Sequence, residues 1–431
     1  MSTQRNSPLY LRTGLQAPRS ASMTSTPKSS QSPSSADRYD QRGVSASKSE
    51  VHQAIRHLDK GLFPNAFCKI LPDAAGGDPD FANILHADTA GTKTSLAYCY
   101  WRETGNLDVW AGIAQDALVM NLDDMACAGA TGPFLISSTI GRNKHLIPGE
   151  VLAALINGTT AFLDQMSDLG VAIHHGGGET ADVGDIVRTA DVGFTAFARL
   201  RRNGVFVNEI KPGAALVVLS SSGQASYETQ YNGGMGSNGL TSARHDLFNP
   251  EYRQKYPESF DPATQADLVY AGPYRLTDPV PTKPGDPDLS DLDMGRLVLS
   301  PTRTYLPFLR EVFQHLRPAL QGLIHTTGGG QTKVLHFLRG VRVVKENLFA
   351  APPLFRLIQQ ASGTPWTDMY RVFNMGQRLE CYVEPQAAED FVRLASRWNI
   401  EAQIAGYTEV APTSDASEVV VKGPYGEFVY R

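Results

Sequence analysis

Short apolar runs bounded by glycine-rich, polar turns alternate with amphipathic helices along this chain. The run Ile84 to Asp88 ends in such a turn, and the run Ala214 to Ser220 begins after one. Ile113 to Ala130 and Val151 to Leu169 place their apolar residues at helical spacing. The second half repeats this style, with predicted helices at 305–316 and 387–398. The alternation predicts a mixed α/β (α+β) fold.

The length of the chain favours two domains, because 431 residues exceed what one hydrophobic core usually serves. The Lys-Pro-Gly turn at 211–213 marks the predicted domain boundary. The N-terminal domain then spans 37–212, and the C-terminal domain spans 213–411 and is followed by a C-terminal tail at 412–431. Residues 246–298 are rich in Pro, Asp, Gly and Tyr without sustained periodicity, which indicates a surface insertion, with a lid as one interpretation.

Residues 1–36 are dominated by Ser, Thr, Pro, Gln and Arg, and they contain no acidic residue and no apolar period. Such a segment cannot offset the entropy of ordering, so we predict a disordered tail. The composition also resembles an organellar transit peptide, and an over-long start assignment with Met23 as the later start explains it equally.

Bulk charge and cysteine usage exclude several classes of partner. The 39 basic and 44 acidic residues give a formal charge of −5, so we expect no binding to nucleic acid. No uncharged apolar run approaches the ~18 residues that cross a bilayer, so we expect no membrane association. The four cysteines lack the spacing of a disulfide framework or a zinc site. We interpret them as buried thiols of a soluble, cytoplasmic protein.

The segment from His86 to Lys93 combines a strand end with small residues, one carboxylate and one lysine. Such a turn can hold Mg²⁺ on Asp88 and phosphate on backbone N–H groups and Lys93. It is not a P-loop, because Thr92 separates Gly91 from Lys93. Taken alone, an ordinary solvent-facing turn explains the segment as well as a nucleotide site does.

Asp123 and Asp124 are adjacent carboxylates within a helical, apolar stretch. Neighbouring carboxylates on a half-buried helix repel each other unless a cation or hydrogen-bond donors satisfy them, which suggests a metal. We expect Asp123 to face water and Asp124 to point inward.

Glycine-rich turns recur further along the chain. Three consecutive glycines at 176–178 precede Glu179 and Asp182, and such runs usually let a backbone approach a ligand closely. Each of the other turns, taken singly, is only a turn; they lie at 233–239, 327–330 and 373–376.

The order of these motifs resembles the aminoimidazole ribonucleotide (AIR) synthetase family, over about residues 40 to 410. The wider group includes formylglycinamidine synthetase, selenophosphate synthetase and thiamine monophosphate kinase. The family's Asn-Asp helix is matched by Asp123-Asp124, with the Asn replaced. The other matching segments are Asp88–Lys93, Gly177–Ala181, Ser237–Gly239, Pro301–Arg303, Thr327–Gly330 and Met369–Gly376.

The resemblance implies ATP-dependent ring closure of formylglycinamidine ribonucleotide, by a homodimer whose N-terminal sheets join in a shared barrel. It implies that ATP is bound near the dimer interface. The catalytic residues would be Asp88, Lys93, Asp124 and Glu179, of which the three acids would hold Mg²⁺. ATP would be bound by Lys60, Thr92, Lys93, Gly177, Gly178 and Thr180. The ribotide would be bound by Ser237, Asn238, Arg303, Thr327, Gly328, Gly329, Asn374 and Gly376.

Two departures leave alternatives open. Relatives commonly have His before Ser-Asn-Gly, whereas this chain has Gly236, preceded by an inserted stretch around 224–235. The Asp88 turn has Thr89 where the family has Gly. The alternatives are another ATP-dependent member of the group, of the selenophosphate synthetase or thiamine monophosphate kinase type, and a nucleotide-binding scaffold without activity. Cys68 faintly resembles the reactive cysteine of selenophosphate synthetase.

Overall fold

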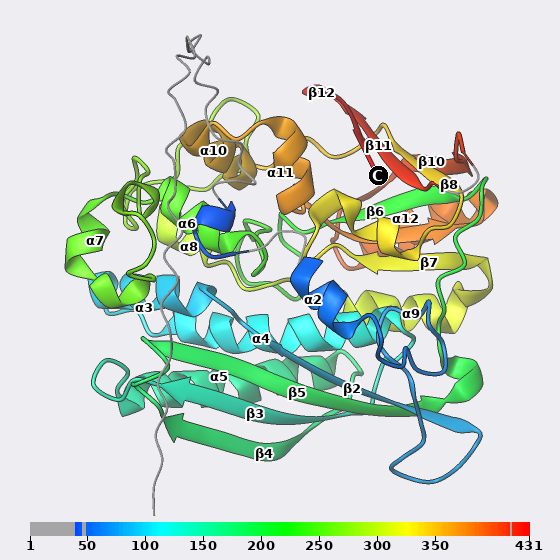
Figure 1. Cartoon of the computed structure of the whole chain (residues 1–431), viewed down its shortest axis with the longest axis horizontal. Coiled ribbons are helices and arrows are strands. Elements are labelled where there is room, and N and C mark those ends of the chain that lie inside the picture. The colour runs from blue at the N-terminus through cyan, green and yellow to red at the C-terminus, as the bar shows by residue number, and fades with distance from the viewer. Residues whose placement is uncertain (1–38, 45–48, 414–415) are drawn as a thin grey trace, which may run out of the picture. The chain divides into compact units, whose positions relative to one another are not determined.

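Two β-sheets organise the chain in the computed structural model, which describes residues 39–44, 49–413 and 416–431 (Figure 1). The predicted disordered tail at 1–36 lies outside these ranges. The first sheet has the strand order β1-β2-β5-β3-β4. Its strands are β1 (Leu71–Pro72), β2 (Phe81–Thr89), β3 (Phe134–Arg142), β4 (Ile173–Asp182) and β5 (Ala190–Arg201).

Helix α4 (Asp108–Cys127) lies between the first sheet and the second half of the chain. It packs against β2 and β5 on one side and against α9 (Leu306–His315) on the other. Nearly all of its residues are buried, as expected for a helix enclosed between two layers. Helices α3 (Lys93–Thr104) and α5 (Gly149–Asp168) pack beside α4 (Figure 1).

The second sheet has seven strands in the order β12-β11-β8-β10-β6-β9-β7. Its strands are β6 (Ala215–Ser220), β7 (Leu320–His325), β8 (Val341–Lys345), β9 (Gln377–Val383), β10 (Ala402–Val410), β11 (Glu418–Gly423) and β12 (Gly426–Tyr430). The remaining α-helices are α2 (Ser49–Ile55), α6 (Leu240–Leu247), α7 (Glu251–Lys255), α8 (Met294–Val298), α10 (Pro353–Ser362), α11 (Trp366–Val372) and α12 (Ala388–Arg397). The predicted mixed α/β fold is confirmed, and no closed barrel forms within the described ranges.

The chain leaves the first sheet at the end of β5 and enters the second at β6, an interval that contains the predicted turn at 211–213. Residues 34–431 nevertheless form one compact unit by their internal contacts, so a division there remains a prediction. The predicted C-terminal tail instead contributes the β11–β12 hairpin, and β11 pairs in parallel with β8.

Part of the insertion at 246–298 packs into the protein core, while much of 261–267 and 281–291 is exposed. Its Tyr252, Tyr256 and Tyr270 are buried and contact one another through their rings. Tyr256 also lies edge-on to Tyr98 of α3, at 5.9 Å between ring centroids. These aromatic contacts anchor this part of the insertion, and the lid interpretation stays a prediction.

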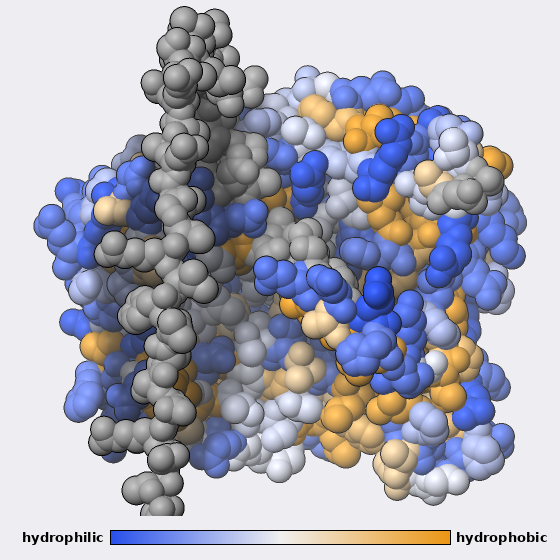
Figure 2. Space-filling view, viewed as in Figure 1, coloured by the Kyte–Doolittle hydropathy of each residue, from blue (hydrophilic) through white to orange (hydrophobic). Residues whose placement is uncertain are grey.

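The face of the first sheet opposite α4 carries exposed apolar side chains. The register aligns Leu85 of β2, Phe197 of β5 and Leu135 of β3 in one row across the sheet. Leu85 is 61% exposed and Leu135 is 52% exposed. In Figure 2, hydrophobic atoms gather in the lower right of the view, where this sheet lies in Figure 1. We call this row the outer face.

Candidate active site

The turn that follows β2 meets the Ser-Asn-Gly segment at helix α6. The hydroxyl groups of Thr92 and Thr241 are 2.8 Å apart and share a hydrogen bond. Thr241 lies two residues after Gly239, the last residue of Ser-Asn-Gly. A segment predicted to bind ATP therefore contacts a segment predicted to bind the ribotide.

Asp124 lies near the C-terminal end of α4 and is held by two histidines. His325 Nδ1 is 2.6 Å from Asp124 Oδ1, and His86 Nε2 is 3.8 Å from Asp124 Oδ2. Burial acts to raise the pKa of Asp124, but the hydrogen bond from His325 and the charge of nearby Lys333 hold this pKa below its ordinary value. The carboxylate is therefore ionised at neutral pH and retains 13% side-chain exposure.

Asp88 shares the neighbourhood of Asp124. The side chain of Asn121, one helical turn before Asp124, lies 3.5 Å from the backbone oxygen of Asp88. His86 and Asp88 alternate with outward-facing residues along β2, so both are on the face toward α4. Asn121 and His86 thus connect the end of β2, which carries Asp88, to the part of α4 that carries Asp124.

Glu179 lies elsewhere in this sheet. The register aligns Thr89, Gly193, Thr139 and Glu179 in one row from β2 to β4. Three strand spacings of about 4.8 Å put Glu179 about 14 Å from β2. Paired residues point to the same face, so Glu179 shares the outer face with Thr139. The predicted ATP ligands Gly177, Gly178 and Thr180 are likewise exposed on the edge strand β4.

The prediction that Asp123 faces water is wrong, whereas Asp124 points inward as predicted and is 13% exposed. Asp123 is only 1% exposed, and burial raises its pKa. Its carboxylate accepts hydrogen bonds from the Thr304 hydroxyl at 2.6 Å and from the backbone N–H of Tyr305 at 2.9 Å. Asp123 therefore joins α4 to the start of α9, which leaves Asp124 as the carboxylate that a ligand can reach.

Lys93 is fully buried. Its ammonium group donates to Asp116 Oδ1 at 2.8 Å and to the backbone oxygen of Ser300 at 2.7 Å. The same Asp116 oxygen accepts from Thr302. Burial lowers the pKa of Lys93, although Asp116 partly opposes this effect. In this arrangement Lys93 connects two parts of the chain and does not reach a phosphate.

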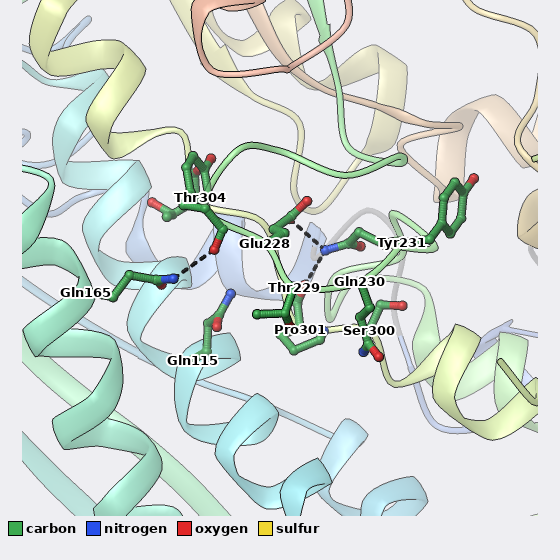
Figure 3. Close-up of a pocket in the computed structure, with 11 residues that line it drawn as sticks. Gln115, Gln165, Glu228, Thr229, Gln230, Tyr231, Ser300, Pro301 and Thr304 are labelled. Atoms are coloured by element: carbon green, nitrogen blue, oxygen red, sulfur yellow. Dashed lines mark hydrogen bonds between the residues drawn. The ribbon is translucent and has the colours of Figure 1, made fainter. Parts of the chain in front are cut away.

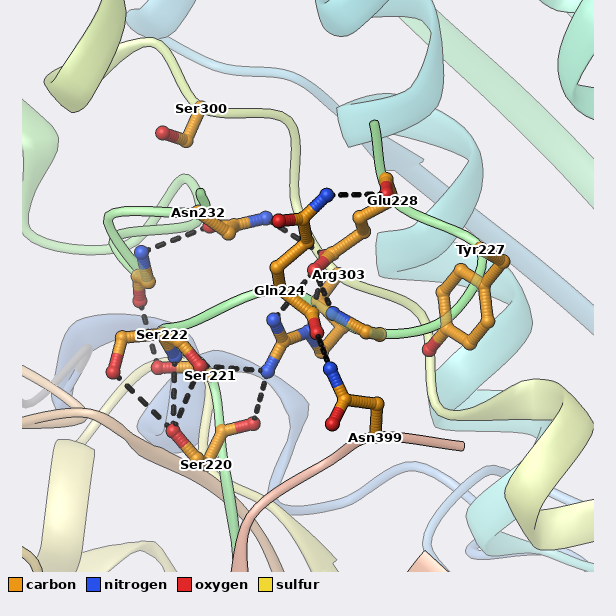
Figure 4. Close-up of polar contacts among 12 residues, drawn as sticks. Ser220, Ser221, Ser222, Gln224, Tyr227, Glu228, Asn232, Ser300, Arg303 and Asn399 are labelled. Atoms are coloured by element: carbon orange, nitrogen blue, oxygen red, sulfur yellow. Dashed lines mark hydrogen bonds and ion pairs between the residues drawn. The ribbon is translucent and has the colours of Figure 1, made fainter. Parts of the chain in front are cut away.

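Arg303, predicted to position the ribotide, is also enclosed by protein groups (Figure 4). Its Nε donates to Glu228 at 3.0 Å, and a second nitrogen pairs with the other Glu228 oxygen at 2.5 Å. The remaining nitrogen donates to the backbone oxygens of Ser220 and Ser222. Glu228 belongs to the inserted stretch at 224–235, so contact of Arg303 with a ligand would require this ion pair to open.

The remaining predicted ribotide residues cluster around two turns. Asn238 Nδ2 lies 3.6 Å from the position that a Cβ would take on Gly328, so the Ser-Asn-Gly and Thr-Gly-Gly-Gly turns are neighbours. Lys333 Nζ is 3.3 Å from the Thr327 hydroxyl. The buried hydroxyl oxygen of Ser237 has no hydrogen-bond partner among the described residues. Gly329 adopts a positive φ of 93° at the start of the following 3₁₀ helix, η5 (Gly330–Phe337).

Asn374 and Gly376 make hydrogen bonds that fix the backbone next to these turns. The amide nitrogen of Asn374 donates to the backbone oxygen of Gly234 at 2.9 Å, and its oxygen accepts from the N–H of Gly376 at 2.7 Å. Both residues are buried. Their contacts hold the Gly-rich segment before Ser237 in place.

Gly330 closes the Thr-Gly-Gly-Gly turn in a position that excludes a side chain. Its φ is +48°, and an added Cβ would lie 2.6 Å from the carbonyl oxygen of Phe373 and 2.7 Å from that of Tyr370. We expect Gly330→Ala to lower the free energy of unfolding by about 3 kcal/mol, because steric overlap adds to the cost of a positive φ. Denaturant unfolding measures this change.

Gly363→Ala is the matched control for Gly330→Ala. Gly363 has a φ of +66° but no atom within 4 Å of an added Cβ. This variant should lose only about 1 kcal/mol, the cost of the left-handed backbone. Equal losses in the two variants would contradict the steric explanation.

Sequence reasoning missed two basic groups at this site. Lys333 lies three residues after the Thr-Gly-Gly-Gly turn, and Arg378 lies two residues after Gly376. Arg378 Nε donates to His325 Nε2 at 3.0 Å. Lys60, predicted to neutralise phosphate, is exposed in the loop after α2. The sequence signal that could have identified Lys333 and Arg378 was their closeness along the chain to the glycines of the motifs.

Cys68 does not have the properties of a reactive thiol. It is 7% exposed, and its sulfur donates to the backbone oxygen of Asp124 at 3.2 Å. Burial raises the pKa of Cys68 well above its ordinary value, so the nucleophilic thiolate is disfavoured. The faint resemblance to a selenophosphate synthetase cysteine therefore gains no support.

The donor set at this site fits a magnesium ion that arrives with ATP. Among the described residues, no group of three or more His, Cys, Asp or Glu side chains could hold a metal by itself. Magnesium usually retains several waters and binds one or two carboxylates together with substrate phosphates. Asp88 and Asp124 are the carboxylates predicted for this role, and their part in metal binding stays a prediction.

A cavity of about 130 Å³ lies between α4, α5 and the inserted stretch (Figure 3). Its polar lining includes Gln115, Gln165, Gln230 and Asn232. No residue predicted to bind ATP, metal or ribotide lines it. This cavity is therefore separate from the site around Asp124.

This chain is similar to known proteins of one family. Residues 72–200 match the family model described as AIR synthase related protein, N-terminal domain. The predicted resemblance to the AIR synthetase family is thereby confirmed. None of the helices in the described ranges combines the length and apolar character needed to span a membrane.

Individual relatives agree with this class. Phosphoribosylformylglycinamidine cyclo-ligase from Methanocaldococcus jannaschii is 25% identical over 76% of this chain and 78% of its own length. The protein of the same name from Thermococcus kodakarensis is 27% identical over 83% of this chain and 92% of its own. The structure of T. maritima PurL complexed with ADP superimposes with a TM-score of 0.50 at 12% identity, over 89% of this chain and 48% of PurL.

Proposed function

We propose that this chain catalyses the ATP-dependent ring closure of formylglycinamidine ribonucleotide to aminoimidazole ribonucleotide, ADP and phosphate, a step of purine biosynthesis. The names of the curated relatives support this reaction. We place it in the cytoplasm, since all four cysteines are free and buried.

The convergence of separate motifs is the observation that carries the proposal. The Thr92–Thr241 contact joins the turn after β2 to the Ser-Asn-Gly segment, and His325 joins Asp124 to the Thr-Gly-Gly-Gly turn that follows it. A phosphate donor and a ribotide would thus meet at the boundary between the two sheets. The order of the motifs along the sequence does not by itself imply that the phosphate donor and the ribotide bind next to each other.

In the proposed reaction the formyl amide oxygen attacks the γ-phosphorus of ATP, and ADP leaves. The amidine nitrogen of the same molecule then attacks the activated carbon, the bond to the phosphorylated oxygen breaks, and phosphate is released as the ring loses a proton. Because the nucleophile is tethered, the protein mainly orients the substrate and neutralises charge. Lys333 and the backbone N–H groups of Gly328 and Gly329 are suited to this task.

Asp88 and Asp124 would hold the magnesium ion that accompanies ATP, and the ion would supply charge neutralisation at the phosphates. Asp124 is oriented for this role by His325, which occupies one of its oxygens. Lys93 and Arg303 would act indirectly through their buried ion pairs.

Incubation of the purified protein with ATP, Mg²⁺ and formylglycinamidine ribonucleotide tests the proposal. We expect aminoimidazole ribonucleotide and ADP in equal amounts, with no product when Mg²⁺ is chelated. ATP binding without product would favour a nucleotide-binding scaffold. ATP turnover with selenide or thiamine monophosphate, and none with the ribotide, would favour another member of the group.

We further propose that two copies associate through the outer face, with their sheets forming a shared barrel. The exposed row of Leu85, Phe197 and Leu135 supports this, because adjoining apolar side chains on an uncovered sheet favour burial. Glu179, which lies on the same face as Thr139, would then be enclosed by this interface. The glycine-rich strand β4 would lie at its edge.

Leu135→Arg should convert the dimer to a monomer, because an unpaired cation would be buried at the interface. Light scattering coupled to size-exclusion chromatography measures this mass. Val410→Arg is the control, since Val410 is 70% exposed in β10 of the other sheet and its replacement should leave the dimer intact. A Leu135→Arg variant that remains dimeric would place the interface elsewhere.

A further inference from the structure

The guanidinium group of Arg378 lies beside Gly236 at the proposed active site. A Cβ built on Gly236 would lie 3.1 Å from Arg378 Nη1 and 3.7 Å from the Thr302 hydroxyl. Gly236 also has a φ of +68°, which few side chains adopt. The guanidinium group therefore lies where a side chain at position 236 would project, directly before Ser237.

Arg378 is fixed in this place by the protein. It is 2% exposed, at the start of β9, and its Nη2 is 3.2 Å from the backbone oxygen of Arg303. Its Nε donates to His325 Nε2 at 3.0 Å. A guanidinium group can only donate hydrogen bonds, so Nε2 of His325 accepts the hydrogen bond from Arg378. Nδ1 of His325 therefore carries the proton and donates a hydrogen bond to Asp124 Oδ1 at 2.6 Å.

We infer that Arg378 is a positioning residue for the proposed reaction. Its charge-assisted hydrogen bond orients His325, which in turn holds Asp124, while its guanidinium group fills the space beside Gly236. A fixed cation on β9 thus takes the place of a side chain at position 236. This inference rests on the proposed function and assigns a role that the motifs of the chain do not include.

The geometry favours arginine over other residues at position 378. One planar group must bridge the imidazole of His325, the Arg303 carbonyl and the space at Gly236, and the guanidinium fork has donors in all three directions. Lysine would keep the positive charge but would lack the planar, branched set of N–H donors. Methionine would keep much of the volume but neither charge nor donors.

Replacement of Arg378 in the full-length protein tests the inference. Arg378→Ala should lower kcat for aminoimidazole formation by about 100-fold, in the range found when one preorganised donor is removed, while the KM for ATP changes less than about threefold. Arg378→Lys should retain about a tenth of the wild-type kcat, and Arg378→Met should resemble Arg378→Ala. Thermal unfolding of each variant establishes that it is folded at the assay temperature.

Chemical rescue separates positioning from simple space filling. Guanidinium ion at millimolar concentration should raise the kcat of Arg378→Ala at least tenfold, whereas urea, a neutral molecule of similar shape, should not. Equal rescue by urea, or a kcat of Arg378→Ala within threefold of wild type, would overturn the inference. If Arg378→Ala does not fold, the kcat values of Arg378→Lys and Arg378→Met are compared instead. Equal kcat values of these two variants would overturn the inference.

The wild-type assay distinguishes the two possible failures. A wild-type protein that forms no aminoimidazole ribonucleotide contradicts the proposed function. A wild-type protein that forms it, together with Arg378 variants of normal kcat, contradicts only the role of Arg378.

Discussion

Asp124→Asn should lower turnover by about two to three orders of magnitude while the protein remains folded. The asparagine oxygen can still accept the hydrogen bond from His325, so the local packing survives. The negative charge that would bind magnesium is lost, which removes several kcal/mol of transition-state stabilisation. Initial rates at saturating ATP, together with the dependence of rate on magnesium concentration, measure the effect.

Asp123→Asn is the matched control, because it makes the same substitution one residue earlier on α4. Asp123 accepts from Thr304 and Tyr305 in the interior, so its amide variant must turn one N–H group toward a donor. We expect a loss of about 1–3 kcal/mol in the free energy of unfolding and a much smaller loss of turnover below the unfolding transition. Near-normal turnover of Asp124→Asn would remove Asp124 from the metal site.

Lys93→Met should destabilise the protein by about 3–5 kcal/mol, because it leaves the Asp116 carboxylate buried without its cation. Both side chains of this pair are 0% exposed. Denaturant unfolding measures the change. An effect below about 1 kcal/mol, together with a large rise in the KM for ATP, would instead return Lys93 to the phosphate-binding role that the motif suggests.

The double variant Lys93→Met/Asp116→Asn isolates the charge effect of this ion pair. The asparagine oxygen can still accept from the N–H and hydroxyl groups of Thr302, while the unpaired negative charge is gone. We expect the double variant to be more stable than Lys93→Met alone. A double variant that is less stable would mean that packing of the lysine stem, and not the charge, dominates.

Much of the secondary structure could be predicted from local pattern. Helices α4 and α5 and strand β6 agree with the predicted segments to within about five residues, because apolar spacing reports directly which face of an element is buried. Long periodic segments were predictable, and short or irregular ones were not.

The candidate site was predictable in composition but not in arrangement. The sequence indicated that Asp88, Asp124 and the glycine-rich turns belong together, and in the structure the Ser-Asn-Gly and Thr-Gly-Gly-Gly turns are neighbours. The structure also encloses Lys93 in an ion pair with Asp116 and Arg303 in an ion pair with Glu228. In both pairs the partner is distant in sequence. No local pattern could reveal those partners, because the pairing depends on how the layers pack.

The sequence by itself determined the class of fold and the motif residues, since periodicity, turn residues and motif order are all properties of neighbours along the chain. Tertiary structure decided which of Asp123 and Asp124 is fully buried, on which face of the sheet Glu179 lies, and which cation fills the space beside Gly236. The physical reason is that burial and charge pairing arise between segments that meet only after the sheets and helices have packed. A residue's type gives the chemistry it can perform, and its surroundings determine whether it performs that chemistry.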